Sequence, residues 1–185
     1  MPNAGNRYAW IALIVLVIIA DQATKWAILA SSTFNALECL DMTIACGRIE
    51  ISSVFDLTML WNRGISFGTL QSDGWMRWVL VLATSGIAVA FIFWLMRAER
   101  RLTALSLSLV IGGAIGNLID RVRFGAVVDF LDFSGPWFGA HIGNWPVGFP
   151  WVFNIADAAI TVGAVLLFLD QFLMSRSGSG ESSRA

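Results

Sequence analysis

Residues 9–30 have the sequence AWIALIVLVIIADQATKWAILA, in which Asp21 and Lys25 are the only charged side chains. At 1.5 Å per residue, a helix of this length covers about 33 Å, which matches a hydrocarbon core of about 30 Å. Residues 75–96, 102–119 and 153–174 are comparably long and apolar. The pattern predicts an α-helical membrane protein with four transmembrane helices, the first of which is retained because no A-x-A cleavage pattern follows it.

The composition agrees with a lipid environment. Of 185 residues, 57% are hydrophobic and only 14% are charged, whereas a soluble domain carries about a quarter charged residues. Lys and Arg (12) nearly balance Asp and Glu (13), which argues against a nucleic-acid partner. The single histidine, His141, leaves few partners for a zinc, haem or Ser-His-Asp site, so we expect no metal and no cofactor.

The arginines predict the orientation in the membrane. The turn at residues 97–101 has the sequence RAERR, whereas the longer segment 31–74 contains only Arg48 and Arg63 as basic residues. The positive-inside rule therefore places this turn and both termini in the cytoplasm. Segments 31–74 and 122–152 then face outward.

The outward-facing segments have different local patterns. Residues 48–51 and 54–61 are rich in β-branched and aromatic residues with partial alternation, which predicts a small extracytoplasmic β-sheet. Residues 122–152 combine aromatic residues with Gly and Pro, which is typical of an irregular loop at the membrane interface. Residues 175–185 are expected to form a flexible tail, which leaves residues 1–174 as a single membrane domain.

Polar side chains of three predicted helices fall at one depth near the outer surface. Asp21 follows about 18 Å of apolar helix, and the third and fourth helices bring their polar residues to the same side. These residues are Asp21, Asn117, Asp120, Arg121, Asn154 and Asp157. An ionisable group within a span costs about 2.5 to 3.5 kcal/mol on insertion scales, so their convergence indicates a functional site.

The spacing within the helices sharpens this hypothesis. Gly113, Asn117 and Arg121 form one stripe at i, i+4 and i+8, and Asn154 and Asp157 share a face at i, i+3. A purely structural interpretation competes with it. The sequence GGAIG at residues 112–116 is also a small-xxx-small packing motif, and the Asp21 and Lys25 spacing suits a structural ion pair.

A further acid, Asp129, lies between apolar neighbours in the sequence VVDFLD at residues 127–132. Burial among such neighbours would raise the pKa of its carboxyl group and suit it to acid-base chemistry. If Asp129 lies near Asp157, the two carboxyls would share one proton, with one acting as base and the other as acid. The residues alone do not favour Asp129 over Asp120 or Asp132.

Five motifs along the chain closely resemble those of the bacterial lipoprotein signal peptidases, or signal peptidase II. They are DQATK at residues 21–25, NRGISFG at 62–68, GGAIGNLIDR at 112–121, VVDF at 127–130 and FNIAD at 153–157. The resemblance spans about residues 10–174. It implies an intramembrane aspartic peptidase of the inner membrane that removes the signal peptide of a prolipoprotein just before its diacylglyceryl-modified cysteine, and that cyclic peptides inhibit.

The resemblance also implies roles for single residues. Asp129 and Asp157 would form the catalytic dyad. The residues that would line or brace the substrate site are Asn62, Gly113, Asn117, Arg121 and Asn154, with Asp21 and Lys25 in support. The chain departs from the family pattern in the longer segment 34–47, where Cys39 and Cys46 are expected to form a disulfide on the oxidising outer side.

Three other functions compete with this hypothesis. The sequence GISFG at residues 64–68 fits the G-x-S-x-G pattern of a serine peptidase, with Ser66 as nucleophile and Lys25 as base. A small ion-coupled transporter would also contain buried acids, but the four spans show no internal repeat. A purely structural membrane protein would give no reason for the cost of the buried acids.

Overall fold

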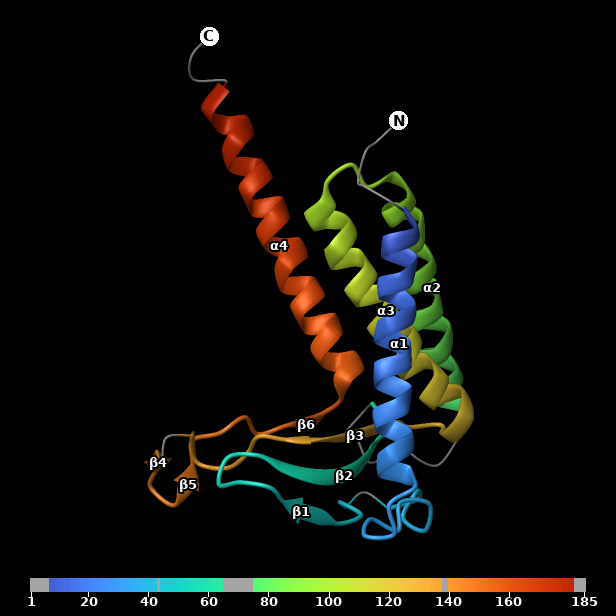
Figure 1. Ribbon diagram of the computed structural model, residues 1–185, viewed down its shortest axis with the longest axis vertical. Coiled ribbons are helices and arrows are strands. Elements are labelled where there is room, and N and C mark those ends of the chain that lie inside the picture. Colours follow the sequence, from blue (N-terminus) through green and yellow to red (C-terminus); the bar gives the residue numbers. More distant parts are fainter. Residues whose placement is uncertain (1–6, 43, 65–74, 138–139, 182–185) are drawn as a thin grey trace.

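The computed structural model describes residues 7–42, 44–64, 75–137 and 140–181, and Figure 1 shows long helices standing on one small sheet. The helices are α1 (Arg7–Leu29), α2 (Trp75–Arg97), α3 (Arg101–Phe124) and α4 (Ile155–Glu181). Within the described residues, all four are long and apolar enough to cross a membrane, as predicted. α1 begins and α4 ends at one end of the bundle, and the sheet lies at the other end (Figure 1).

α3 is the central helix because it packs against α1, α2 and α4. Its small residues permit the close approach. A Cβ atom on Gly112 would press against Val17 of α1, and a Cβ atom on Gly113 would overlap the Ala156 carbonyl of α4. The sequence GGAIG thus serves helix packing, as the competing structural interpretation holds.

α3 runs on to Phe124 instead of ending near Ile119. The helix continues because Asn117 and Asp120 are buried and find polar partners within the protein. It ends at Gly125, which adopts a φ of 76° and donates its N–H to the Arg121 carbonyl at 3.0 Å. Such a left-handed cap favours glycine.

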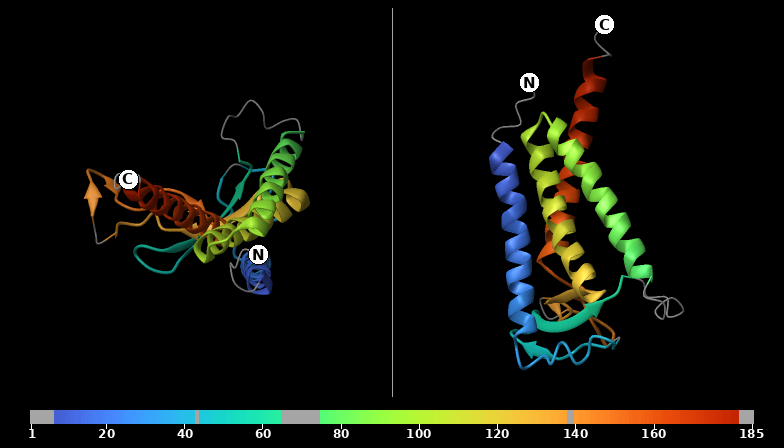
Figure 2. Two further views of the ribbon diagram at one scale, coloured as in Figure 1. Left: turned by 90° about the horizontal axis from the view of Figure 1, so that it is seen from above. Right: turned by 90° about the vertical axis from the view of Figure 1, so that its right-hand side faces the viewer.

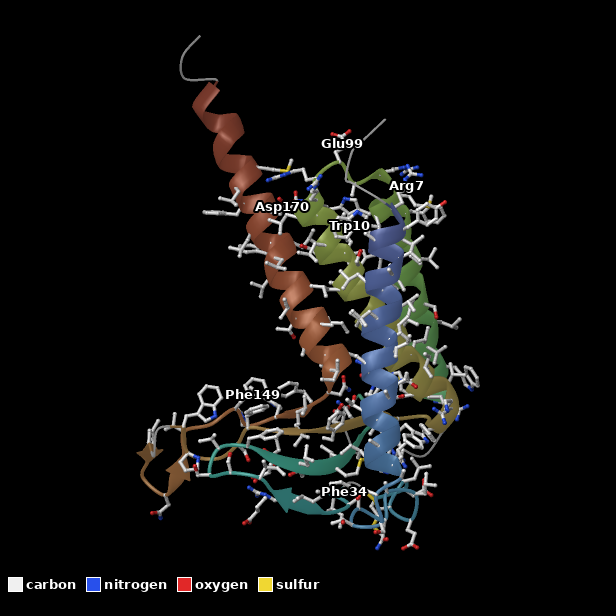
Figure 3. All side chains as sticks on the ribbon, viewed as in Figure 1. Arg7, Trp10, Phe34, Glu99, Phe149 and Asp170 are labelled. Carbon is white, nitrogen blue, oxygen red and sulfur yellow. A yellow bond between two sulfur atoms is a disulfide. The ribbon has the colours of Figure 1, made fainter. Side chains whose placement is uncertain are left out.

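α4 extends past Met174 to Glu181, so residues 175–181, where the sequence predicts a tail, are helical. Once a helix is nucleated, each further residue adds a hydrogen bond, and a glycine costs only about 1 kcal/mol. Nearer the bundle, buried Asp170 lies between α4 and α3 (Figure 3), where it pairs with Arg100 at 2.9 Å and accepts a hydrogen bond from Thr103.

The sheet contains four antiparallel strands in the order β1-β2-β3-β6. The strands are β1 (Arg48–Glu50), β2 (Asp56–Asn62), β3 (Val127–Asp132) and β6 (Val152–Phe153). β1 and β2 confirm the predicted sheet. Residues 122–152, predicted as an irregular interfacial loop, also contain β3, the first residue of β6 and a small hairpin of β4 (His141–Ile142) and β5 (Trp145–Pro146). The β-branched and aromatic residues of β3 pair with β2, which a local pattern of Gly and Pro could not reveal.

The sheet lies across the ends of the helices (Figure 2), and its two faces carry different kinds of side chain. Because side chains alternate along a strand, Asp129 points to the opposite face from Val128 and Phe130. The face with Val128 and Phe130 belongs to the main hydrophobic cluster. The buried residues of this cluster are Ile28, Phe34, Ala36, Cys39, Met59, Trp61, Ala126, Val128 and Phe130.

Candidate active site

Asp157 is held at the start of α4 by a reciprocal pair of hydrogen bonds with Asn154. The Asp157 N–H donates to Asn154 Oδ1 at 2.9 Å, and the Asn154 N–H donates to Asp157 Oδ2 at 3.3 Å. This arrangement is a capping box, in which a carboxylate also benefits from the partial positive charge of the helix N-terminus. The sequence Asn-Ile-Ala-Asp carries this capping signal, and it fixes the direction of the carboxylate.

Asp129 lies on β3, and only 1% of it is exposed. Its two oxygens accept hydrogen bonds from Asn62 Nδ2 at 2.9 Å and from Asn154 Nδ2 at 2.7 Å. Burial raises the pKa of the Asp129 carboxyl to about 7, and the negative charge of Asp157 adds to this effect. The hydrogen bonds from Asn62 and Asn154 and the charge of Lys25 oppose the rise without cancelling it.

Asn154 therefore contacts both acids at once, through its amide side chain and its backbone N–H. Asp132, the other acid of β3, lies at the opposite end of the strand, where it accepts hydrogen bonds from Thr58 Oγ1 at 2.7 Å and the Ser134 N–H at 2.9 Å. Burial alone would raise the pKa of Asp132, but the hydrogen bonds from Ser134 and Thr58 and the charge of Arg48 leave it lowered. Asp132 is thus a stable carboxylate that braces the sheet.

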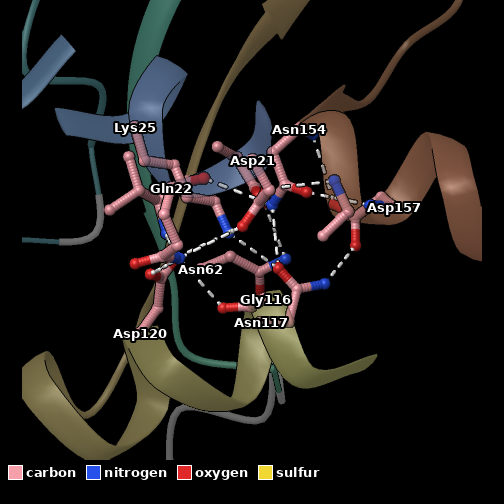
Figure 4. A network of polar contacts seen from close by, with 12 residues as sticks. Asp21, Gln22, Lys25, Asn62, Gly116, Asn117, Asp120, Asn154 and Asp157 are labelled. Atoms are coloured by element: carbon pink, nitrogen blue, oxygen red, sulfur yellow. Dashed lines mark hydrogen bonds and ion pairs between the residues drawn. The ribbon is translucent and has the colours of Figure 1, made fainter. Parts of the chain in front are cut away.

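Beside the acids, Lys25 lies between two buried carboxylates (Figure 4). Its Nζ is 2.9 Å from Asp21 Oδ2 and 2.7 Å from Asp120 Oδ2, and it donates to Asn117 Oδ1 at 3.0 Å. The sequence left Asp120 open as a partner for Asp157 in the acid pair. In the structure, Asp120 is paired with Lys25 instead. The predicted ion pair of Asp21 and Lys25 is present.

The same two carboxylates also hold backbone groups that adjoin the acids. Asp21 Oδ1 accepts the N–H of Ala156 at 3.0 Å, and Asp120 Oδ2 accepts the N–H of Val128 at 3.1 Å. Ala156 directly precedes Asp157, and Val128 directly precedes Asp129. Lys25 therefore connects Asp21 and Asp120, the two carboxylates that hold the backbone next to Asp157 and Asp129.

Asn117 connects this cluster to the acid pair. Its Nδ2 donates to Asp157 Oδ1 at 2.7 Å, while its Oδ1 also accepts from Asn154 Nδ2 at 3.1 Å. Gln22 was not predicted as a site residue, yet it donates to Asp120 Oδ1 at 3.0 Å and to the Gly116 carbonyl at 3.1 Å. Its place beside Asp21, at the depth where the other polar residues gather, was the signal that could have identified it.

A cavity of about 660 Å³ extends from Asp157 between α2, α3 and α4. Its polar end is formed by Asn117, Arg121 and Asp157, and its long wall is apolar. The wall includes Ile87, Phe91, Trp94, Val110, Ile160, Leu167 and Phe168. The arrangement suits an apolar chain whose end reaches the Asp157 carboxyl.

The predicted site residues are thus mostly brought together. Gly113 does not line the cavity; it packs against Ala156 of α4, directly before Asp157. Ser66 and Gly68, the core of the serine-peptidase alternative, lie outside the described residues. Its proposed base, Lys25, is only 2% exposed and is already paired with Asp21 and Asp120.

Comparison with known proteins gives consistent matches over nearly the whole chain. A sequence model of the family described as Signal peptidase (SPase) II matches residues 13–173. The lipoprotein signal peptidase of Burkholderia ambifaria strain MC40-6 is 41% identical over 172 residues, covering 92% of this chain and 91% of the relative. That of Burkholderia vietnamiensis strain G4 is 40% identical with the same coverage. A bacterial membrane enzyme structure solved in meso at 1.9 Å resolution superposes with a TM-score of 0.67 at 28% identity, covering 88% of this chain and 92% of that one.

Proposed function

This chain belongs to the signal peptidase II family, and we propose that it cleaves diacylglyceryl-modified prolipoproteins as an intramembrane aspartic endopeptidase, just before the lipidated cysteine. The observation that supports this most directly is the contact of Asn154 with both Asp129 and Asp157. Two carboxyls that share one amide beside an apolar cavity suit acid-base hydrolysis of a peptide bond.

The surroundings of the two acids support different roles for them. Asp129 keeps its proton up to a pH of about 7, so near neutral pH it acts as the acid and Asp157 as the base. Asp157 takes a proton from water as the water oxygen attacks the scissile carbonyl, and Asp129 gives its proton to the carbonyl oxygen. The C–N bond then breaks as the leaving nitrogen takes the proton now on Asp157 and a hydroxyl of the tetrahedral intermediate returns a proton to Asp129, which restores both acids.

Lys25 acts in support by holding Asp21 and Asp120 at the backbone positions next to the acids. A buried lysine between two carboxylates gains strong charge-assisted hydrogen bonds, whereas either carboxylate alone would be costly to bury. This arrangement sets the separation of β3 from α4, and therefore of Asp129 from Asp157.

The cavity is proposed to receive the apolar part of the signal peptide. Asp157 and Phe168 both line it, and α4 rises about 16 Å between them. A helix of about 11 residues has this length, which falls within the 7 to 15 residues of a signal-peptide apolar region. Arg121, Asn117 and Asn62 then offer donors to backbone carbonyls near the scissile bond. Cyclic peptide inhibitors of the family would occupy the same end of the cavity.

The arginines of the turn between α2 and α3 support a cytoplasmic position for that turn and for both termini. Asp129 lies on β3 and Asp157 at the start of α4, and both elements meet at the other end of the bundle (Figure 1), so the reaction would take place near the outer face of the inner membrane.

Cleavage of a synthetic diacylglyceryl-modified precursor by the purified protein tests the proposal, with the unlipidated precursor as the comparison. We expect cleavage of the lipidated form, with the new N-terminus at the modified cysteine by mass spectrometry. Ser66→Ala should retain most of the activity and Asp157→Asn none. An inactive Ser66→Ala beside an active Asp157→Asn would favour the serine-peptidase alternative.

A further inference from the structure

The segment 34–47, which we call the disulfide loop, packs against the face of the sheet opposite Asp129. Phe34 is 1% exposed and Cys39 is 7% exposed, and both belong to the main hydrophobic cluster. Figure 3 shows Phe34 on the side of the sheet away from the helices. The disulfide loop thus packs against β2 and β3 on the face of the sheet that does not carry Asp129.

The disulfide loop also holds the two residues on either side of Asn62. Trp61 Nε1 donates to the Ala36 carbonyl at 2.7 Å, and Arg63 Nη2 donates to the Leu40 carbonyl at 2.6 Å. The Asn62 side chain is itself exposed, and its Oδ1 accepts a hydrogen bond from the Gly64 N–H at 2.8 Å, so its direction follows the backbone of residues 62–64. Its position over Asp129 therefore depends on where the neighbouring residues are held.

The disulfide joins the part of the loop that makes these contacts to the part that is bound to β2. Cys39 precedes Leu40, the acceptor for Arg63, and it is bonded to Cys46. The Cys46 N–H donates to the Met59 carbonyl at 2.7 Å, which attaches this end of the loop to β2. The bond restrains the carbonyl that holds Arg63 relative to the strand that carries Asn62.

We propose that the disulfide loop, acting through Arg63, positions Asn62 for its hydrogen bond to Asp129, an inference that rests on the proposed role of Asp129 as the acid. Arg63 is a positioning residue and touches neither reacting carboxyl. Its contact with Leu40 is a charge-assisted hydrogen bond to a fixed backbone atom. Its ion pair with Asp41 at 3.0 Å is different, because the Asp41 side chain is fully exposed and such pairs contribute little.

The test compares Arg63→Ala, Arg63→Lys and the double variant Cys39→Ser/Cys46→Ser, with Asp41→Asn as the matched control. We expect kcat to fall about 2- to 10-fold in Arg63→Ala and in the double variant, the range for one lost net hydrogen bond, with KM nearly unchanged. Arg63→Lys should recover part of the loss, and Asp41→Asn should match the wild type.

The pH profile separates positioning from a general loss of structure. The Asn62 hydrogen bond lowers the pKa of Asp129, so weakening it should move the alkaline limb of kcat to higher pH. The charged groups that face Asp129 are Asp157 from α4, Arg121 from α3 and Lys25 from α1, and none of them is changed by these variants.

Asn62→Ala gives the reference for each outcome. If Asn62→Ala is fully active, the proposed role of Asn62 itself fails. If Asn62→Ala is impaired while Arg63→Ala keeps the wild-type kcat and pH profile, positioning by the disulfide loop is overturned and the proposed function stands. Should the double serine variant accumulate poorly, Arg63→Ala decides, because the partly exposed Arg63 side chain is not part of the hydrophobic cluster.

Discussion

Asp129 and Asp132 are the same residue type on one short strand, yet their surroundings give them opposite properties. Asp129 is buried beside another acid, and the pKa of its carboxyl rises to about 7. Asp132 accepts hydrogen bonds from Thr58 and Ser134, and its pKa is lowered. The sequence VVDFLD does not distinguish them, since the difference comes from partners outside this segment, most of them far away along the chain, such as Thr58, Asn62 and Asp157.

Replacing the acids should separate these roles. Asp129→Asn and Asp157→Asn should each lower the cleavage rate by at least about 100-fold, because acid-base catalysis contributes about 10²- to 10⁴-fold. Asp132→Asn should retain most of the activity. Initial rates on lipidated precursor, normalised to the amount of folded protein, make the comparison. An active Asp129→Asn beside an inactive Asp120→Asn or Asp132→Asn would show that the partner of Asp157 is a different acid.

The pH dependence should report the proton on Asp129. Since the pKa of this carboxyl is raised to about 7, the acid is protonated below that pH and ionised above it. We therefore expect kcat to fall as the pH rises through about 7, when Asp129 loses the proton that the proposed mechanism requires it to donate. A profile measured from pH 5 to 9 checks this. A rate that keeps rising up to pH 9 would exclude Asp129 as the acid.

At the scale of the elements, α3 sets how closely α1 and α4 approach and therefore where their acids lie. Gly113 packs against Ile160 and against the carbonyl of Ala156, the residue directly before Asp157 in α4. Gly116 leaves room for the Asp21 carboxyl of α1. These glycines thus determine the site without touching the reacting atoms.

Gly113→Ala and Gly86→Ala form a matched pair for this effect. A Cβ atom at position 113 would overlap the Ala156 carbonyl, and such overpacking costs about 1 to 3 kcal/mol. At Gly86 of α2, nothing lies within 4 Å of the added atom. Alanine there should be neutral or stabilise the helix by up to about 1 kcal/mol. The thermal unfolding temperature and the turnover rate should both fall for Gly113→Ala, and neither should fall for Gly86→Ala. Equal effects in the two variants would contradict the packing argument.

At the scale of the whole molecule, the sheet and the acids lie at one end of the bundle and the basic turn lies at the other. Figure 3 shows Glu99 at the end away from the sheet. The polar network joins α1, α3, α4 and β3 at the sheet end (Figure 4). A single orientation in the membrane therefore fixes the side on which cleavage would occur.

Cysteine labelling tests this orientation. The two native cysteines are bonded to each other, so single cysteines added at exposed Glu99 and Ser53 give separate signals. In intact cells, an impermeant thiol reagent should label Ser53→Cys, and it should label Glu99→Cys only after the membrane is opened. The reverse pattern would place the acids near the cytoplasmic face.

The sequence by itself determined the four spans, the strands at residues 48–62 and the depth at which polar residues gather. These features depend on local apolar patterns and on helix rise, which act over neighbouring residues. It also identified the resemblance that the comparisons confirm. The pairing of Cys39 with Cys46 was expected from the outer location and is present.

Only the tertiary structure decided which acid lies with Asp157, and why Asp120 and Asp132 do not. Asp129 meets Asn154 because β3 pairs with β2 and lies against the start of α4, contacts between segments that are far apart in sequence. The extension of α3 to Phe124 and the strands within residues 122–152 have the same origin. Local propensity sets an element's tendency to form, whereas a buried charge is placed by whichever distant partners satisfy it.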